Sequence, residues 1–317
     1  MIYLAIFALL LFAILVYFRV AHRYNIIDKP NHRSSHTAIT IRGGGILFYF
    51  GALIYFIWSG FQYPYFFCGL TLMALISFLD DMYTLSNKLR IIIHLIAVFL
   101  LFFEVGLFSL PLWVIPLALV VTIGIVNAYN FMDGINGITT IYSFAVLWLL
   151  WLVNRELAFI DERLLYCTGI ANAVFAFFNY RQRAKCFAGD VGSVSMAFLL
   201  VFMLAMLIKT SGNFVYLLFL TVYGVDTGWT ILQRIRKKEN IFEAHRSHLY
   251  QYLANEAGIN KLVVAASYGL LQLSIGLMVV YITNYGITVQ IISSVIILLL
   301  MSFIYLYIKN NIEKKLL

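Results

Sequence analysis

Long apolar runs separated by short polar loops dominate this sequence. Runs of ~17–25 mostly apolar residues are long enough to cross a bilayer as helices. Eleven such runs are predicted as helices near residues 2–18, 44–60, 63–79, 91–108, 111–127, 136–153, 163–179, 194–209, 213–228, 262–283 and 287–308. The pattern predicts an all-α polytopic membrane protein, with residues 1–317 forming a single integral membrane domain.

The composition supports a membrane protein. Hydrophobic residues make up 63% of the chain and charged residues 11%, whereas a water-soluble globule would be nearer ~45–50% apolar. No basic residue precedes the first apolar run and no small-residue cleavage site follows it, so it is predicted to be a retained span rather than a signal peptide.

Basic residues alternate along the loops. Of the 22 Lys and Arg residues, 19 fall in loops 19–43, 80–90, 180–193, 229–261 and 309–317. Because basic loops stay on the cytoplasmic side, these loops and 127–136 are predicted to be cytoplasmic, with the N-terminus outside and the C-terminus cytoplasmic. The net charge of +8 then reflects topology and affinity for anionic lipid, and nucleic-acid binding is not expected.

The segment 127–138, NAYNFMDGINGI, is polar and lies between two apolar runs. Asn130, Asp133 and Asn136 are spaced at i, i+3 and i+6, so a helix would place them on one face. Gly134 and Gly137 would let a ligand approach the backbone where the next helix begins. The segment therefore predicts an anion pocket at the membrane surface, with simple helix capping at a tight loop as the alternative.

Two adjacent acids, Asp80 and Asp81, end the third predicted helix. Their carboxylates repel each other and the negative end of the helix dipole. They therefore need a cation, which could be Mg²⁺, a basic side chain or a shared proton. A salt-bridge cluster with Lys88 and Arg90 is the structural alternative to a catalytic or metal site.

Asp190 lies in the turn FAGDVGS, just before the eighth predicted helix and shortly after three basic residues. A carboxylate there could hold a metal ion, while nearby amides and cations bind the phosphate oxygens that the metal bridges. The alternative is an acid favoured only by the helix dipole.

The first basic loop is rich in hydrogen-bond donors, which include His36 and Arg42. Gly43, Gly44 and Gly45 follow, and their backbone amides could hold phosphate at a helix start. Glycines that only allow close helix packing explain the same residues, so both interpretations stay open.

His245 and His248 are three residues apart, with Arg246 between them. On a helix the two imidazoles would share a face and, with the guanidinium, would suit diphosphate oxygens. A zinc pair lacks a third soft ligand nearby, and a solvated helix face is a further alternative. Asp226 ends the ninth predicted helix, whereas the two helices after Lys261 carry no acid and are predicted only to pack and to face lipid.

All of these polar clusters fall on one side under a topology derived only from Lys and Arg. Acids for a divalent metal, helix N-termini for phosphates and cations for a leaving diphosphate are the components of phosphoryl transfer. Their position at the bilayer surface predicts one water-soluble phosphate substrate and one lipid substrate.

The order and spacing of RGGG, the Asp80–Asp81 pair, NAYNFMDGINGI, FAGDVGS and HRSHLYQ resemble the polyprenyl-phosphate N-acetylhexosamine-1-phosphate transferases. The resemblance covers nearly the whole chain. NFMDGI and HRSH are most similar to the bacterial branch that starts O-antigen or capsule chains, since the peptidoglycan translocase has a run of three histidines. The resemblance thus implies a multi-pass protein of the bacterial inner membrane.

The implied reaction is a Mg²⁺-dependent transfer, with Mn²⁺ as a substitute, of sugar-1-phosphate from a UDP-N-acetylhexosamine to undecaprenyl phosphate, releasing UMP. Asp190 matches the family's metal-binding aspartate. Asp80 and Asp81 match its acidic pair, which acts either as base or as nucleophile in a two-step route.

The resemblance also implies a binding set for the UDP-sugar and its diphosphate. One residue departs from the family pattern, because many members carry aspartate where this chain has Asn136. The implied binding residues are Asn130, Asp133, Asn136, His245, Arg246 and His248, with His36, Arg42 and Asp226 as further candidates.

A transporter with a cytoplasmic vestibule of acids and histidines is the alternative from another class. It predicts charged residues near the midplane and paired half-chain repeats, whereas here the acids gather at one surface and no repeat is seen. The sequence leaves open which UDP-sugar is used (N-acetylglucosamine or a 6-deoxy relative), the glycan pathway and whether the protein forms a homodimer.

Overall fold

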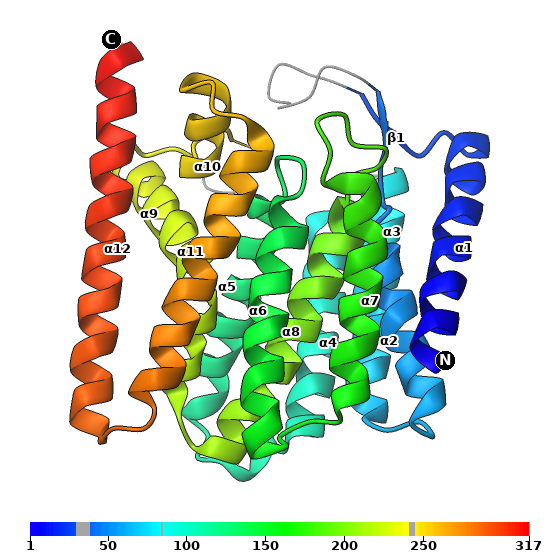
Figure 1. Cartoon of the computed structure of the whole chain (residues 1–317), viewed down its shortest axis with the longest axis horizontal. Helices are drawn as coiled ribbons and strands as arrows, with labels where there is room; N and C mark the ends of the chain where they lie inside the picture. The colour runs from blue at the N-terminus through cyan, green and yellow to red at the C-terminus, as the bar shows by residue number, and fades with distance from the viewer. Residues whose placement is uncertain (30–38, 84, 241–244, 317) are drawn as a thin grey trace.

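The computed structural model describes residues 1–29, 39–83, 85–240 and 245–316. Long helices lie side by side in a single bundle (Figure 1). They are α1 (Ile2–Arg23), α2 (Ile46–Trp58), α3 (Pro64–Tyr83), α4 (Asn87–Val105), α5 (Val114–Met132), α6 (Ile138–Leu157), α7 (Glu162–Asn179), α8 (Gly189–Ser211), α9 (Thr221–Arg236), α11 (Lys261–Ile282) and α12 (Ile287–Leu316). The shorter elements are β1 (Ile27–Asp28), β2 (Thr40–Ile41), η1 (Leu107–Ser109), η2 (Phe214–Leu220), α10 (Leu249–Gln251) and η3 (Tyr252–Glu256).

Each predicted apolar run coincides with a helix, the ninth being η2 continued by α9. Eight helical segments in the described ranges are long and apolar enough to cross a membrane. α2 has 13 residues and is shorter, and α4 and α7 carry charged residues near their ends. The prediction of an all-α polytopic membrane protein is confirmed.

α8 is the central helix of the bundle. In its most apolar stretch 83% of the residues are buried, compared with 17% in α12 at the edge. α2, α3, α4, α5 and α6 all contact α8. Because α8 begins at the FAGDVGS turn, the packing of the bundle fixes the position of that turn.

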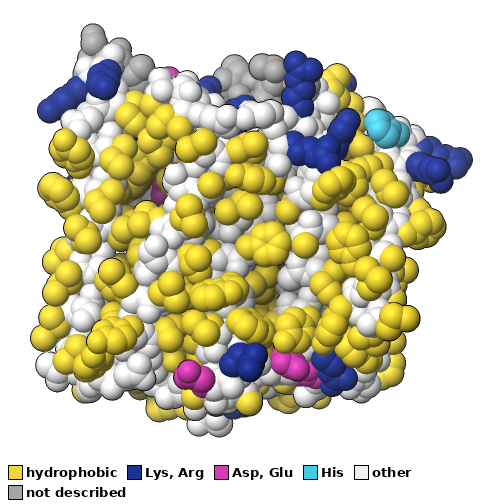
Figure 2. Space-filling model, in the orientation of Figure 1, with side chains coloured by type: hydrophobic (Ala, Val, Ile, Leu, Met, Phe, Trp, Pro, Cys, Tyr) yellow, Lys and Arg dark blue, Asp and Glu magenta, His cyan; other side chains and the backbone are white. Residues whose placement is uncertain are grey.

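The surface separates apolar from charged regions. Figure 2 shows a broad apolar band across the middle of the molecule, with most of the visible Lys and Arg residues along one end and a few charges of both signs at the other. The C-terminal end of α1, β1, α10 and the C-terminus of the chain lie toward the same end, and the N-terminus lies toward the other (Figure 1). The described parts of the loops predicted to be cytoplasmic therefore share one end of the bundle.

The glycine run before α2 packs against the start of α8. β1 and β2 form an antiparallel pair, and the amides of Gly44 and Gly45 donate to the carbonyls of Phe187 (2.9 Å) and Ala188 (3.1 Å). A Cβ on Gly192 would come within 2.7 Å of the Gly45 Cα, so only glycine allows this approach. The prediction that these two amides hold phosphate is wrong, because backbone carbonyls already use them; the packing interpretation is correct.

Candidate active site

Three carboxylates and two guanidiniums from four segments form an acidic cluster, defined here as Asp80, Asp81, Asp190, Arg42 and Arg90. Arg42 Nε lies 2.6 Å from Asp81 Oδ1, and its Nη2 lies 3.1 Å from Asp190 Oδ1. Arg90 Nη1 lies 2.7 Å from Asp80 Oδ2, and its Nη2 lies 3.5 Å from Asp190 Oδ2. The structure thus brings together the three acids predicted to be catalytic, and each arginine bridges Asp190 to one member of the pair.

Asp81 anchors the first turn of α8. Its side chain is fully buried, and its two oxygens accept hydrogen bonds from the amides of Asp190 (3.0 Å) and Val191 (3.1 Å). A carboxylate is stabilised at a helix N-terminus by the free amides and the helix dipole. This contact supplies the positive partner that the end of α3 lacks. A Cβ on Gly189, where φ is +71°, would lie 2.5 Å from Asp81 Oδ2, so this position requires glycine.

Beside the acidic cluster lies a cavity of ≈ 240 Å³. Its walls come from separate motifs: the first loop, the 127–138 segment, the start of α8 and the segment after His248. Among the three carboxylates of the acidic cluster, only that of Asp190 lines the cavity. Its side chain is 18% exposed. The predicted binding residues among its lining are Arg42, Asn130, Asp133, Asn136 and Asp190.

The 127–138 segment reaches the cavity as a turn rather than as one helix. α5 ends at Met132 and Asp133 is its C-terminal cap, so the predicted shared helical face is wrong. Asn130 Nδ2 donates to Ser193 Oγ (3.1 Å) at the start of α8. Asn136 Nδ2 donates to the carbonyls of Arg181 (2.7 Å) and Gln182 (3.2 Å). The amide nitrogen of Asn136 therefore holds the 181–182 loop, which leaves its oxygen for other partners.

Asp133 is partly buried in the cavity wall, where it accepts a hydrogen bond from Thr139 Oγ1 (2.6 Å). Burial, and to a smaller extent the charge of Asp190, raises the pKa of Asp133 to about 6. A positive group entering the cavity would favour its ionised form.

Several residues around the cavity were not predicted from the sequence. Asn179 Oδ1 accepts the amide of Gly137 (2.8 Å), where φ is +83°. This bond uses the amide that the sequence assigned to anion binding. Asp28, Ser193 and Gln251 also line the cavity. Single polar residues in separate elements give no periodic signal, although Asp28 lies in a recognisable turn sequence.

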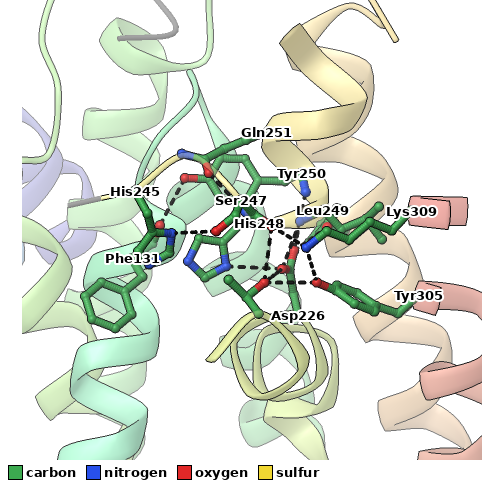
Figure 3. A network of polar contacts seen from close by, with 12 residues as sticks. Phe131, Asp226, His245, Ser247, His248, Leu249, Tyr250, Gln251, Tyr305 and Lys309 are labelled. Carbon is green, nitrogen blue, oxygen red and sulfur yellow. Dashed lines mark hydrogen bonds and ion pairs between the residues drawn. The ribbon is translucent and has the colours of Figure 1, made fainter. Parts of the chain in front are cut away.

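The His245–His248 segment is not helical, so the predicted shared helix face is wrong. His248 is the N-terminal cap of the short helix α10. The two rings still lie 4.9 Å apart between centroids, and both lie against Phe131 near the end of α5 (6.0 and 6.2 Å). Figure 3 shows this arrangement. The segment is thus adjacent to Asn130, although its histidines do not line the cavity. His36 lies outside the described residues.

Asp226 explains why α10 begins directly after His248. Its carboxylate accepts from His248 Nδ1 (3.1 Å) and from the amides of Leu249 (3.0 Å) and Tyr250 (3.3 Å). The hydroxyl of Tyr268 donates to it as well (2.7 Å). Asp226 is 2% exposed and does not line the cavity. It therefore acts as a structural anchor of the histidine segment, in contrast to the candidate substrate contact that the sequence suggested.

The remaining groups of this segment differ in charge. Burial, together with the neighbouring His248, lowers the pKa of His245 to about 4, so this imidazole is neutral at pH 7. Its Nδ1 lies 3.0 Å from Ser247 Oγ. Arg246 Nη2 lies 3.5 Å from Glu256 Oε1. Of these side chains, only Arg246 carries a full positive charge that could meet a diphosphate.

The donor set around the cavity suits a magnesium ion better than zinc. Within the described ranges, no three His, Cys, Asp or Glu side chains converge as a ready-made metal site. Mg²⁺ is usually bound by one or two carboxylates together with water and substrate phosphates. Asp190 offers a partly exposed carboxylate beside amide oxygens, so the residues fit a site that substrate phosphates would complete.

Comparison with known proteins matches this region. A family model described as glycosyl transferase family 4 matches residues 63–208, a range that holds the three acids and the 127–138 segment. In this range the chain is similar to glycosyl transferase family 4. The resemblance to polyprenyl-phosphate N-acetylhexosamine-1-phosphate transferases is thereby confirmed.

Relatives extend the match over most of the chain. A probable undecaprenyl-phosphate N-acetylglucosaminyl 1-phosphate transferase of Bacillus subtilis (strain 168) is 27% identical over 259 residues, 74% of this chain and 71% of the relative. Undecaprenyl-phosphate alpha-N-acetylglucosaminyl 1-phosphate transferases of Yersinia pestis and Escherichia coli (strain K12) are 25% and 26% identical, each over 74% of this chain and 71% of the relative. A phospho-N-acetylmuramoyl-pentapeptide-transferase of Clostridium perfringens is 30% identical over 40% of this chain.

Proposed function

We propose that this protein transfers N-acetylhexosamine-1-phosphate from a UDP-sugar to undecaprenyl phosphate and releases UMP. This would be the first membrane step of a cell-surface glycan such as O-antigen or capsule. One observation carries the proposal: segments far apart in the sequence, each bearing a family motif, meet around the cavity beside Asp190. The relatives that span most of the chain are named for transfer to undecaprenyl phosphate, which supports the lipid acceptor.

The reaction exchanges one phosphorus–oxygen bond for another. An oxygen of the lipid phosphate attacks the sugar-bearing phosphorus of the donor, the bond to the UMP oxygen breaks, and UMP leaves. Mg²⁺ held by Asp190 would supply charge neutralisation for the diphosphate. Arg42 reaches both Asp81 and Asp190 at the cavity wall, so its guanidinium is placed to bind phosphate oxygens beside them. Asn130 and Asp133, which belong to the 127–138 segment in the cavity wall, would hydrogen-bond the nucleotide or the sugar.

The acidic pair has a smaller part in this direct route. A phosphate monoester has a second pKa near ~6, so the acceptor is largely deprotonated at pH 7 and a base helps only modestly. Asp81 accepts from Arg42 and from two α8 amides, whereas Asp80 accepts from Arg90 and from the amide of Leu85. Because Asp80 accepts fewer hydrogen bonds than Asp81, we favour Asp80 as the group that accepts the proton of the lipid phosphate. A two-step route through a phosphosugar–aspartate adduct is the alternative.

The orientation follows from the charge pattern. Most Lys and Arg residues belong to loops at the end of the bundle that holds the cavity, so this end is proposed to face the cytoplasm of a bacterial inner membrane. Sugar nucleotides would then enter from water while the lipid phosphate arrives along the bilayer surface.

The direct test uses purified protein with undecaprenyl phosphate, Mg²⁺ and a panel of UDP-N-acetylhexosamines that includes 6-deoxy sugars. UMP release is expected with at least one sugar, only when the lipid is present, and is expected to be lost on chelation of the metal. Asp161→Asn is a matched control, because Asp161 also pairs with an arginine but caps α7 away from the cavity. Normal turnover is expected for this control.

Two further outcomes separate the alternatives. Lipid-independent flux of a labelled UDP-sugar across liposomes, without UMP release, would establish a transporter and reject the proposal. A radiolabelled phosphosugar–protein adduct that forms without lipid would replace the direct route with the two-step route.

A further inference from the structure

Lys309 is a buried cation in α12, just beyond the predicted span 287–308 and within the segment 309–317 that the sequence assigned to a basic cytoplasmic loop. It is 1% exposed. Its Nζ donates to the carbonyl of Ser247 (2.5 Å) and to the hydroxyl of Tyr305 (2.9 Å). Figure 3 shows the side chain entering the network around Asp226 from the side of α12. The helix thus continues past residue 308, and Lys309 contacts the backbone between the two histidines instead of lying in a loop.

A chain of hydrogen bonds connects Lys309 to His248. The hydroxyl of Tyr305 lies 3.0 Å from Thr230 Oγ1, and Thr230 Oγ1 donates to Asp226 Oδ1 (3.3 Å). The same carboxylate oxygen lies 3.1 Å from His248 Nδ1. Lys309 thus holds the histidine segment directly, through a backbone carbonyl, and indirectly, through the anchor of the second ring.

The orientation of the His245 ring also depends on the position of the Ser247 backbone. Ser247 Oγ lies 3.0 Å from His245 Nδ1, so a shift of the Ser247 backbone would release the orientation of that ring. His248 Nε2 is buried and makes no hydrogen bond within the described part of the chain. A buried, oriented and unpartnered ring nitrogen is suited to a ligand group rather than to packing alone.

The environment of Lys309 is costly for a residue that only packs. In the ranges that the structure describes, no carboxylate lies within ion-pair distance of its ammonium, which instead meets two neutral oxygens and the rings of Tyr252 (5.1 Å) and Tyr305 (5.3 Å). Burial disfavours the ammonium, and the charges of Asp226 and Glu313 offset this only from beyond ion-pair distance. A methionine or leucine would fill the same space at lower cost, so the ammonium is best explained by the carbonyl that it holds.

We propose that Lys309 is a positioning residue for donor binding: it fixes the His245–His248 segment where that segment meets the diphosphate of the nucleotide sugar. The inference deepens the proposed transferase function and rests on it. Lys309 itself touches neither the cavity nor the acidic cluster, so it acts through Ser247 and through the Asp226 network.

The test compares Lys309→Met, which keeps length and packing but removes the donor, with Lys314→Met, the same change at an exposed site on the same helix. Loss of a charged hydrogen bond of ~1.4 kcal/mol corresponds to about tenfold in binding. The KM for the UDP-sugar and the Kd for UDP, measured by calorimetry without lipid, are each expected to rise about tenfold in K309M, with kcat within about threefold. K314M should stay within about twofold, and Lys309→Arg should recover most of the affinity.

Unchanged KM and Kd in folded K309M would overturn the inference, as would equal losses in K314M. If K309M does not purify as a folded protein, Tyr305→Phe takes its place. That variant removes one bond to the ammonium and the link to Thr230, and a KM rise of about threefold is expected; no rise would overturn the inference. The measurement of UDP binding separates the two proposals. Wild-type protein that binds UDP but releases no UMP would contradict the transferase function. The ratio of the Kd for UDP in K309M to that in the wild type would still decide the positioning role.

Discussion

The acidic cluster and the Asp226 network each centre on an aspartate, at the start of α8 in one case and within α9 in the other, yet they are built in opposite ways. Asp190 shares two arginines with Asp80 and Asp81 and keeps an exposed edge toward the cavity. Asp226 is closed off by donors from His248, Tyr268 and two backbone amides. The same residue type is thus a candidate ligand in one place and a structural anchor in the other.

The difference lies in what remains available after folding. Every strong donor around Asp226 belongs to the protein, so nothing is left for a ligand and removal of the carboxylate should unfold the segment. Around Asp190 three negative charges share two positive ones, and a further cation is therefore favourable there. Substitutions at the two aspartates should accordingly separate activity from stability.

The largest effect is expected from Asp190→Asn. UMP release should fall by about 1,000-fold or more, because the proposed metal ligand is lost. Thermal unfolding in detergent should change by less than about 1 kcal/mol, since the substitution also relieves repulsion from Asp81. The assay is the UMP release described above, with Asp161→Asn as control; a variant that keeps a tenth of the wild-type rate would contradict the prediction.

Asp226→Ala should show the reverse pattern in stability. Loss of a buried carboxylate that satisfies several donors is expected to lower the free energy of unfolding by about 3 kcal/mol. Thermal unfolding and the protease sensitivity of the 245–256 region would measure it. A stability loss in D190N as large as that in D226A would remove the distinction between the two regions.

The effect of Asp133 on the stability of the fold is expected to depend on pH. Burial raises the pKa of Asp133 in the folded protein to about 6 from its ordinary value of 3.8, so ionisation is more costly in the folded state than in the unfolded state. The protonated carboxyl of Asp133 therefore contributes to the free energy of unfolding below pH 4, and this contribution is lost as the pH rises through 6. Asp133→Asn should thus be more stable than wild type by up to roughly 3 kcal/mol at pH 7.5 and nearly equal to it at pH 4. Equal unfolding temperatures at pH 7.5 would contradict the raised pKa.

The smallest effect is expected from Asp80→Asn. If Asp80 accepts the proton of the lipid phosphate, its loss should cost about tenfold in kcat at pH 6 and about threefold at pH 8.5, where the phosphate is already deprotonated. A pH–rate profile of the variant against wild type measures the change. A loss that is constant across this range would assign Asp80 to holding Arg90 instead.

The fold was largely predictable from the sequence, and the site only in part. Runs of apolar residues located every long helix because the bilayer dictates their length. The acids Asp80, Asp81 and Asp190 could be predicted as a group because charge at a membrane surface is costly and rare. Arg42 was a weak candidate, since nothing local shows that β2 and the glycine run carry it onto α8.

Other features depend on tertiary contacts that no local pattern encodes. The spacing of His245 and His248 suggested a helix, but Asp226 accepts hydrogen bonds from the amides of Leu249 and Tyr250, and α10 begins only at Leu249. Lys309 was overlooked for the same reason, because its partner carbonyl is 62 residues away in the chain. Periodicity reports which face of a helix is apolar, and it does not report which distant backbone group a buried cation will meet.

The most direct test of the central claim is the binding of Mn²⁺, as a paramagnetic substitute for Mg²⁺, in the presence of UDP. Electron paramagnetic resonance of the wild type and of the control Asp161→Asn should show one bound ion each, whereas Asp190→Asn should show none at the same concentrations. A bound ion that persists unchanged in D190N would contradict the assignment of the cavity beside Asp190 as the centre of the reaction.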